Sequence, residues 1–485
     1  MVFNRLIVYP ARKHAAKVFE KLLLENPAAY DGQRDNLPAI YLEGSPIRCR
    51  DDTDRELPFH QEANFMYLTG AHNLPDASVL ISIIPRPPEG PGPGQPTTER
   101  KTEIDESEVR TVLFIPPVDP LHVMWSGLPE TATQVHARLG DLTAVKFKTE
   151  LASELNRLQQ TKPKLSVITL PGISHEAAHP EPLLLAAIRE ARTTKTAQEV
   201  QLMRHANRVS SDAHTEVMKL VHARALRSEA DAEMCFRRAC HGGGCKTQAY
   251  EPIFGYGFHA GTLHYTANDA SIPDDFAGLL LVDAGCEAYG YASDITRTLP
   301  LGNRGRFTPE ARDIYNIVLD MQEAALKTIK AGIEWQEIQI LMHKVAAQGL
   351  LKLGILRDVT VDECYADGHV LPFFPHGVGH FIGLDTHDVA GLPHGKGAHP
   401  TMKYLRLQRR LEAGNVVTVE PGLYFNQFLL DPVKGSANIN HEVLVKYLPV
   451  GGVRIEDNVV VTETGCTNLT QVVKTIEEIE KITGY

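Results

Sequence analysis

The sequence predicts an α/β domain followed by an α+β domain, on the basis of three observations. The chain has 485 residues, which is too long for one ordinary hydrophobic core. Residues 1–192 alternate short strand-like apolar runs with helical stripes, whereas residues 193–485 combine long amphipathic helices with strand pairs. A capped helix start just after residue 193 marks the boundary between the two.

The composition excludes several classes of protein. The hydrophobic fraction of 43% and the charged fraction of 22% are typical of a globular protein, and a net charge of −11 argues against nucleic-acid binding. Seven scattered cysteines do not form a disulfide framework. The N-terminus lacks the apolar core of a secretory signal, and no run approaches the length of a membrane span. We therefore expect a cytoplasmic protein.

The elements of the first domain follow from its apolar periodicity. Apolar residues three and four apart predict helices, and β-branched or aromatic runs closed by Gly or Pro predict strands. The helices are expected over 12–25, 132–139 and 149–159, and the strands over 39–43, 64–68, 78–84, 111–115 and 165–170.

A segment rich in proline and glycine interrupts this domain. Residues 85–108 begin with a run of Pro and Gly and end in charged residues. Such a composition cannot bury enough apolar surface to order itself, so we expect a flexible insertion between two strands.

The second domain begins with a capping box, Thr196-Ala-Gln-Glu199, in which two side chains satisfy the free amides of a helix start. Long helices are expected from residue 197 and over 312–330 and 335–353, the last two followed by Gly332 and Gly354. Strands are expected over 278–285, 291–298, 415–420 and 453–461. Because helices and strand pairs occur twice, we expect two related halves.

The stretch from 375 to 388 concentrates chemistry-bearing residues. It holds three histidines and two aspartates among three glycines, which is unsuited to a core or a regular helix. His376 and His380 have the spacing of a helical zinc motif, but no Glu follows His376 and two glycines separate the histidines. We therefore predict a catalytic loop with one metal ligand and separate substrate-facing histidines.

Four carboxylates lie in or at the end of apolar strands: Asp283, Asp294, Glu420 and Glu456. A buried ionised carboxylate is costly unless it is paired or bound to a metal. Four of them plus an imidazole favour a pair of divalent cations, and an oxygen-rich donor set suits Mn²⁺ better than structural zinc. Such a two-metal centre activates water, so the expected reaction is hydrolysis.

These residues also carry a family resemblance. The motifs that carry it are VDAG (282–285), SDITRT (293–298), HGVGH (376–380), VEPGLY (419–424) and RIED (454–457). By these motifs the chain resembles the pita-bread metallopeptidases, above all the prolidases (Xaa-Pro dipeptidases) and the Xaa-Pro aminopeptidases. The resemblance extends over essentially the whole chain and implies a creatinase-type N-terminal domain over 1–192 and a pita-bread catalytic domain over 193–485.

The resemblance implies a role for each residue of the site. Asp283, Asp294, His380, Glu420 and Glu456 correspond to the ligands of two Mn²⁺ ions, with Asp294 and Glu456 bridging. Glu420 would also transfer a proton between the attacking water and the departing amine. The residues that would contact the substrate are His264, His376, His387 and Arg406. Arg454 corresponds either to a substrate contact or to an ion pair behind the metal. Tyr250 would help to accept the proline ring or would simply pack.

The family resemblance implies hydrolysis of the bond between an N-terminal residue and a proline, and it leaves dipeptidase and aminopeptidase activity open. A homodimer is expected, with Trp125 either at its closure or in the core. Two alternatives are weaker. A non-catalytic pita-bread protein-binding module would be expected to lack the ligands, and a metal-free creatinase-like hydrolase would leave the carboxylates uncompensated.

Overall fold

The structure is a computed structural model that describes residues 7–25, 36–84, 103–163, 165–389 and 399–485. The chain divides into two compact units, Met1–Arg192 and Thr193–Tyr485. Across the described ranges, none of the helices has both the length and the apolar character needed to cross a membrane.

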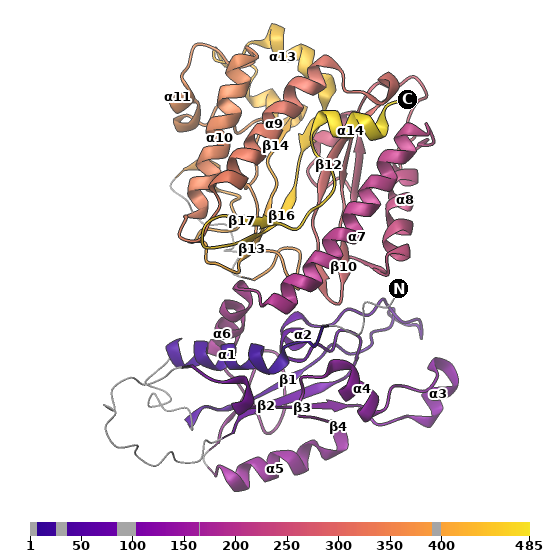
Figure 1. Cartoon of the computed structure of the whole chain (residues 1–485), viewed down its shortest axis with the longest axis vertical. Helices are drawn as coiled ribbons and strands as arrows, with labels where there is room; N and C mark the ends of the chain where they lie inside the picture. The colour runs from indigo at the N-terminus through magenta and orange to yellow at the C-terminus, as the bar shows by residue number, and fades with distance from the viewer. Residues whose placement is uncertain (1–6, 26–35, 85–102, 164, 390–398) are drawn as a thin grey trace. The chain divides into compact units, whose positions relative to one another are not determined.

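The first unit is built on a mixed six-stranded sheet in the order β4-β3-β2-β1-β5-β6. Its core contains Tyr41, Leu80 and Phe114 from the sheet and Leu151 and Leu155 from the helix below. Figure 1 shows the sheet between α1 on one face and α5 on the other. The strands are β1 (Ala39–Glu43), β2 (Ser78–Ile83), β3 (Val109–Ile115), β4 (Ala144–Phe147), β5 (Val167–Thr169) and β6 (His179–Pro180), and the helices are α1 (Ala11–Glu25), α2 (Ala63–Thr69), α3 (Pro120–Ser126), α4 (Ala132–Leu139), α5 (Leu151–Thr161) and α6 (Pro182–Thr193).

One predicted strand of this unit is wrong. Residues 64–68 belong to helix α2 rather than to a strand. The Glu62 side chain accepts a hydrogen bond from the Phe65 amide at the start of the helix, and Gly70 ends it at φ 72°. These end signals and the burial of five consecutive side chains outweigh the strand propensity of Phe and Tyr.

The predicted flexible insertion is corrected at its C-terminal end. Residues 85–102 lie outside the described residues, but 103–108 are ordered. Asp105 and Glu108 form a capping box, the Ile104 amide donates to Glu20 at 2.8 Å, and Ile104 is only 4% exposed. The charged residues of this end therefore serve as helix caps and lead directly into β3.

A buried acid, Glu154 on α5, gathers three cations beside the sheet. Arg157, Arg110 and Lys146 approach its carboxylate at 2.6, 2.9 and 2.8 Å. Burial would raise the pKa of Glu154, but the hydrogen bonds from the three cations outweigh it and lower the pKa from 4.5 to about 2. The carboxylate is thus ionised and ties α5 to β3 and β4.

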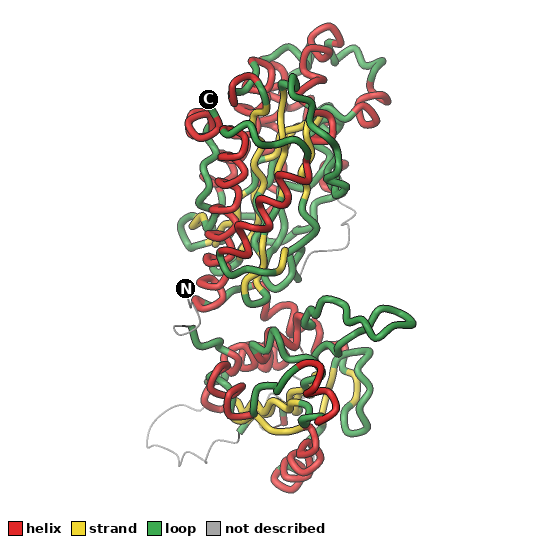
Figure 2. The backbone as a smooth tube through the Cα atoms, turned by 90° about the vertical axis from the view of Figure 1, so that its right-hand side faces the viewer, coloured by secondary structure: helices red, strands yellow, loops and turns green. Residues whose placement is uncertain are grey.

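The second unit contains the long helices predicted from the sequence. The Thr196–Glu199 capping box is formed, and Gly332 and Gly354 adopt φ 88° and 73° after their helices. Its helices are α7 (Ala197–His222), α8 (Glu229–Gly242), α9 (Pro309–Thr328), α10 (Trp335–Lys352), α11 (Val361–Ala366), α12 (Gln427–Leu430), α13 (His441–Tyr447) and α14 (Ile476–Thr483). Figure 2 shows the long helices of this unit along one side of its strands, with loops on the other side.

The strands of this unit come in broken pairs. β9 pairs antiparallel with β12 and β13 with β16, as predicted, while the short strands beyond each break form the separate pairs β10–β11 and β14–β15. Each break lies at one of the apolar-strand carboxylates. The strands are β7 (Thr247–Gln248), β8 (Ile253–Tyr256), β9 (Gly278–Asp283), β10 (Cys286–Ala288), β11 (Tyr291–Ala292), β12 (Thr296–Leu301), β13 (Val416–Val419), β14 (Gly422–Tyr424), β15 (Gly452–Arg454), β16 (Asp457–Val461) and β17 (Cys466–Asn468).

We expect Glu154→Gln to destabilise the first unit by about 1–2 kcal/mol at neutral pH, because three cations lose their shared carboxylate. A lowered pKa in the folded state means that the stabilisation is complete above pH 4.5 and is lost as the pH falls towards about 2. The difference between variant and wild type should therefore shrink below pH 4.5. Hydrogen exchange of β3 and α5 measures it.

The matched control is Glu176→Gln, because this carboxylate is exposed. Its exchange rates should equal those of the wild type. Equal protection of wild type and Glu154→Gln at neutral pH, or a difference undiminished at pH 3, would contradict the account.

Candidate active site

The four predicted carboxylates occupy equivalent places in the fold. Asp283 ends β9, and Asp294 lies between β11 and β12. Glu420 lies between β13 and β14, and Glu456 between β15 and β16. At such a break the side chain no longer has to alternate strictly across the sheet. The breaks therefore let carboxylates from four strands converge on one cavity.

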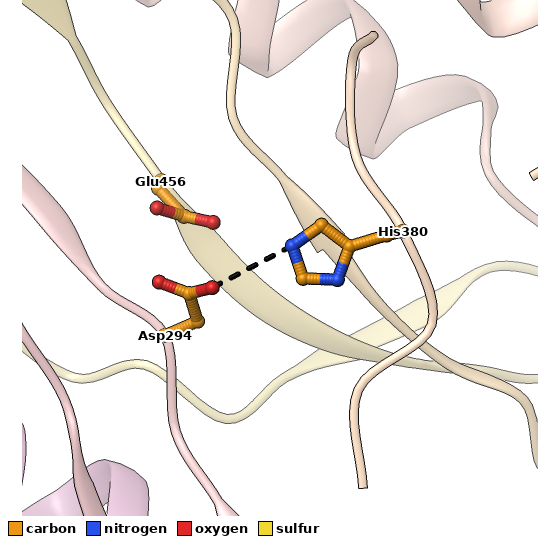
Figure 3. A group of neighbouring side chains, drawn as sticks. All are labelled: Asp294, His380 and Glu456. Atoms are coloured by element: carbon orange, nitrogen blue, oxygen red, sulfur yellow. Dashed lines mark ion pairs between the residues drawn. The ribbon is translucent and has the colours of Figure 1, made fainter. Parts of the chain in front are cut away.

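His380 joins this cluster from the predicted loop, in which residues 376–380 are not helical. Its Nε2 lies 3.5 Å from Oδ2 of Asp294 and 3.4 Å from Oε1 of Glu420. One ligand atom each from Asp294, His380 and Glu456 falls within 4.8 Å of the others. Figure 3 shows these three side chains pointing toward one another. Because this loop is not helical, it cannot form a helical HExxH zinc motif. His380 nevertheless remains a candidate metal ligand, as predicted for the loop.

The orientation of His380 fits a bound cation. Its Nδ1 lies 2.9 Å from the Phe381 carbonyl, an acceptor, so Nδ1 carries the proton and donates it. In the neutral ring Nε2 then turns its lone pair to Asp294 and Glu420, which are themselves acceptors. Three facing acceptors repel one another unless a proton or a cation lies between them. Accordingly, although burial lowers the pKa of His380, the two carboxylates outweigh it and raise the pKa.

The carboxylates of the site also repel one another, and this repulsion shifts their pKa values. Burial and the neighbouring acids raise the pKa of Glu456 well above its ordinary value and that of Glu420 to about 7. Burial and Asp294 likewise raise the pKa of Asp283, against the pull of Arg454. For Asp294, hydrogen bonding to His380 outweighs burial and lowers the pKa. A donor set of four crowded acids and one oriented imidazole is suited to divalent cations.

Arg454 and Tyr250, for which the sequence left a substrate contact and a supporting role open, both contact Asp283. Arg454, which is 3% exposed, donates to Oδ2 of Asp283 at 2.6 Å, and the Tyr250 hydroxyl donates to Oδ1 at 2.6 Å. Both side chains also line the cavity. Their polar groups are therefore engaged with a candidate metal ligand and orient it.

His376 is also tied to its neighbours. Its Nδ1 lies 2.8 Å from the Gly377 carbonyl and must donate, so Nε2 accepts the Tyr424 hydroxyl at 2.8 Å. Tyr424 in turn accepts a hydrogen bond from Arg454 at 2.9 Å. Burial and the charge of Arg454 lower the pKa of His376 to about 3, so the ring is neutral. What remains for a substrate is its apolar ring surface.

A cavity of about 700 Å³ brings together all the predicted site residues. This volume is within the range of small-ligand sites. His264 and His387 are exposed at the cavity, and Arg406 is half-buried there; none of the three has a hydrogen bond or ion pair to another part of the described chain. His387 packs edge-on against His380 with ring centroids 4.4 Å apart. Within the described chain, the polar groups of these three predicted substrate residues are therefore not engaged with other side chains by hydrogen bonds or ion pairs.

The sequence did not indicate several residues that organise the site. Thr296 donates to Glu456 at 2.8 Å, Thr418 accepts from the His380 amide at 3.1 Å, and Tyr424 links His376 to Arg454. All three lie within or beside the motifs that carry the resemblance. However, a hydroxyl inside an apolar strand has no pattern that separates it from ordinary packing.

Two family models match the chain in the order of its two units. The model for the N-terminal domain of aminopeptidase P matches residues 16–168, and that for metallopeptidase family M24 matches residues 201–463. The second match spans more than half of the chain and includes every candidate metal ligand.

Relatives and solved structures agree with these matches. The chain is 40% identical over 498 residues to a probable Xaa-Pro aminopeptidase of Paracoccidioides brasiliensis, covering 98% of this chain and 97% of the relative. Its fold is similar to that of E. coli aminopeptidase P with the inhibitor Pro-Leu, with a TM-score of 0.72, 29% identity, and coverage of 97% of this chain and 98% of that one. For the zinc-substituted E. coli aminopeptidase P in complex with product, the TM-score is 0.71 and the sequence identity 28%, at the same coverage. The chain therefore belongs to metallopeptidase family M24, with an aminopeptidase P N-terminal domain preceding its catalytic domain.

Proposed function

We propose that this protein is an Xaa-Pro aminopeptidase, which hydrolyses the peptide bond between an N-terminal residue and a penultimate proline. The observation that carries the proposal is the convergence, in one cavity, of the five candidate metal ligands with three polar side chains that are unengaged within the described chain. The 40% identical relatives named as probable Xaa-Pro aminopeptidases support the same activity.

We propose two divalent cations, Mn²⁺ in the first instance, as the cofactor. Asp283 would hold one ion, His380 and Glu420 the other, and Asp294 and Glu456 would bridge them. The tautomer of His380 and the mutual repulsion of the acids support this assignment. When bound, the cations would polarise the scissile carbonyl and favour ionisation of the attacking water.

The remaining steps belong to the side chains of this chain. Glu420 would take a proton from the attacking water and deliver it to the proline nitrogen as the bond breaks. His264 and His387, with ring nitrogens unengaged within the described chain, would donate hydrogen bonds to the substrate carbonyl as negative charge develops. Arg454 and Tyr250 would keep Asp283 in place throughout.

Selectivity for proline has a physical basis in this cavity. The bond before proline is a tertiary amide without an N–H, so a site that accepts it must not depend on that donor. His376 has both nitrogens occupied and offers an apolar ring surface, which suits the proline ring.

Dipeptidase activity is the second candidate, favoured by Arg406. Arg406 lines the cavity and has no ion-pair partner in the described parts of the chain. Its guanidinium would bind the carboxylate of a dipeptide through charge-assisted hydrogen bonds. On longer peptides the same group would contact a backbone carbonyl.

We also propose a cytoplasmic homodimer. Helix α3 and the residue that follows its turn present exposed apolar side chains, with Leu121, Met124, Trp125 and Leu128 each 75–81% exposed. An apolar group of this kind commonly marks an interaction site. Trp125 is therefore a surface residue of its unit and not part of its core.

We expect the Mn²⁺-loaded protein to release the N-terminal residue from Xaa-Pro-Xaa tripeptides and longer peptides, but not from Xaa-Ala-Xaa controls. Glu420→Gln should lower kcat by roughly 10²–10⁴-fold because proton transfer is lost. Chromatographic separation of the products measures both. Cleavage of Xaa-Pro dipeptides alone would establish the second candidate, and no cleavage of either would contradict a proline peptidase.

Removal of metal should destabilise the catalytic unit, because the crowded carboxylates lose their counter-charge. Chelation is expected to lower the thermal midpoint, and Mn²⁺ should restore it. In Asp294→Asn the increase with Mn²⁺ should be lost. Scanning calorimetry with and without Mn²⁺ tests this, with the surface variant Asp358→Asn as control. An Mn²⁺-dependent increase of equal size in Asp294→Asn would place the metal elsewhere.

Replacing the exposed apolar side chains of α3 should separate the subunits. Wild type is expected to sediment as a dimer and the double variant Leu121→Asp, Trp125→Ser as a monomer. Phe258→Ser, which alters an equally exposed aromatic residue of the other unit, should remain dimeric. Sedimentation of the double variant as a dimer would exclude α3 as the interface.

A further inference from the structure

We propose that Gln339 on α10 is a positioning residue that fixes the backbone of the catalytic loop and thereby places His376 and His380. The inference deepens the proposed function, since it rests on the roles assigned there to the two histidines. It concerns a side chain outside the cavity lining and outside every motif singled out in the sequence.

The contacts of Gln339 form a clamp on the peptide units around Gly377. Its Oε1 accepts the Val378 amide at 2.7 Å, and its Nε2 donates to the His376 carbonyl at 3.1 Å. The same nitrogen also lies 3.2 Å from the Thr401 carbonyl and 3.1 Å from Nε2 of His343. The side-chain amide of Gln339 thus bonds to the carbonyl of His376 and to the N–H of Val378, two residues later. A residue of a parallel neighbouring strand would make the same pair of bonds.

The loop needs such a clamp because of its glycines. A Cβ at Gly379 would overlap the Thr418 carbonyl, and one at Gly377 would meet the Leu405 Cα at 3.0 Å. Close approach therefore requires glycine at both positions. However, glycine does not favour any one backbone conformation. A loop that contains glycines therefore loses more conformational entropy on folding than a loop of other residues.

Gln339 completes a chain of bonds that reaches a second candidate ligand. On the other side of the loop the Glu420 amide donates to the Val378 carbonyl at 2.8 Å, and the Thr418 amide donates to the His380 carbonyl at 2.9 Å. The Val378 residue is therefore held by Gln339 at its nitrogen and by Glu420 at its oxygen. Through this residue α10 is linked to both the histidine loop and Glu420, which directly follows strand β13.

Burial makes the clamp costly to lose. Gln339 is 0% exposed, and a buried amide is tolerated where its donors and acceptor are satisfied. Methionine has nearly the same length and volume but can neither donate nor accept these bonds. In Gln339→Met the Val378 amide and the His376 carbonyl would seek other partners, and the loop would shift relative to Asp294. Partners that orient metal ligands typically contribute roughly 10–100-fold to metal affinity or activity.

The test compares Gln339→Met with Gln336→Met, the same substitution three residues earlier on α10. The Gln336 side-chain oxygen has no hydrogen-bond partner among the described residues. Titration calorimetry should show Mn²⁺ binding weakened by roughly 10-fold or more in Gln339→Met and unchanged in the control. Gln339→Glu keeps the acceptor for Val378 and, as a protonated buried acid, one of the donors, so its effect should be intermediate. It also serves if the methionine variant does not fold.

The rate of peptide hydrolysis in single and double variants distinguishes a positioning role of Gln339 from a general effect on stability. If Gln339 acts through the loop, His376→Ala should cost much less in the Gln339→Met background than in the wild type. Independent, multiplying losses would overturn the inference, as would Mn²⁺ affinity within two-fold of the wild type. If the wild type binds Mn²⁺ but cleaves no Xaa-Pro peptide, the proposed function fails while the calorimetric comparison still decides the role of Gln339.

Discussion

The repulsion among four crowded carboxylates, three of them buried, is the constraint on which the catalytic unit depends. Asp283, Asp294, Glu420 and Glu456 share one cavity, and Arg454 supplies a single balancing charge at Asp283. Left to themselves, such groups would take up protons or open the structure to water. The fold holds them together nonetheless, through strand breaks that aim each carboxylate inward and through hydroxyls that fix individual oxygens, such as Thr296 on Glu456. The proposed divalent cations would supply the counter-charge that this arrangement lacks.

The same constraint explains why the polar contacts of the site lead outward in connected chains. Arg454 reaches Asp283 and, through Tyr424, His376. Gln339 connects α10 to Val378 and from there to Glu420. In each of these series of hydrogen bonds, a buried polar or charged group is paired with a partner that satisfies it. His264, His387 and Arg406 line the cavity but take part in neither series of hydrogen bonds within the described chain. Their polar groups are therefore available in the proposed role of binding a substrate.

Much of this could be predicted from the sequence, because its signals are local. The Thr196 capping box, the helix-ending glycines and the apolar strand runs identified most elements, and polar residues inside apolar runs identified the metal-site candidates. Residues 64–68 were predicted wrongly because helix caps outweighed strand propensity, and 103–108 because charge there serves capping. Gln339 and Thr296 could not be predicted, since the loop residues that Gln339 holds and the carboxylate that Thr296 holds are 37 or more positions away and depend on the packed fold.

Anomalous diffraction from crystals grown with Mn²⁺ tests the central claim most directly. The account predicts two manganese peaks within the cavity, one bounded by Asp283 and the other by His380 and Glu420, with Asp294 and Glu456 between them. His380 should contact its ion through Nε2, because Nδ1 donates to the Phe381 carbonyl. Anomalous peaks confined to other parts of the molecule, or a cavity in which the acids pair through protons without metal, would contradict it.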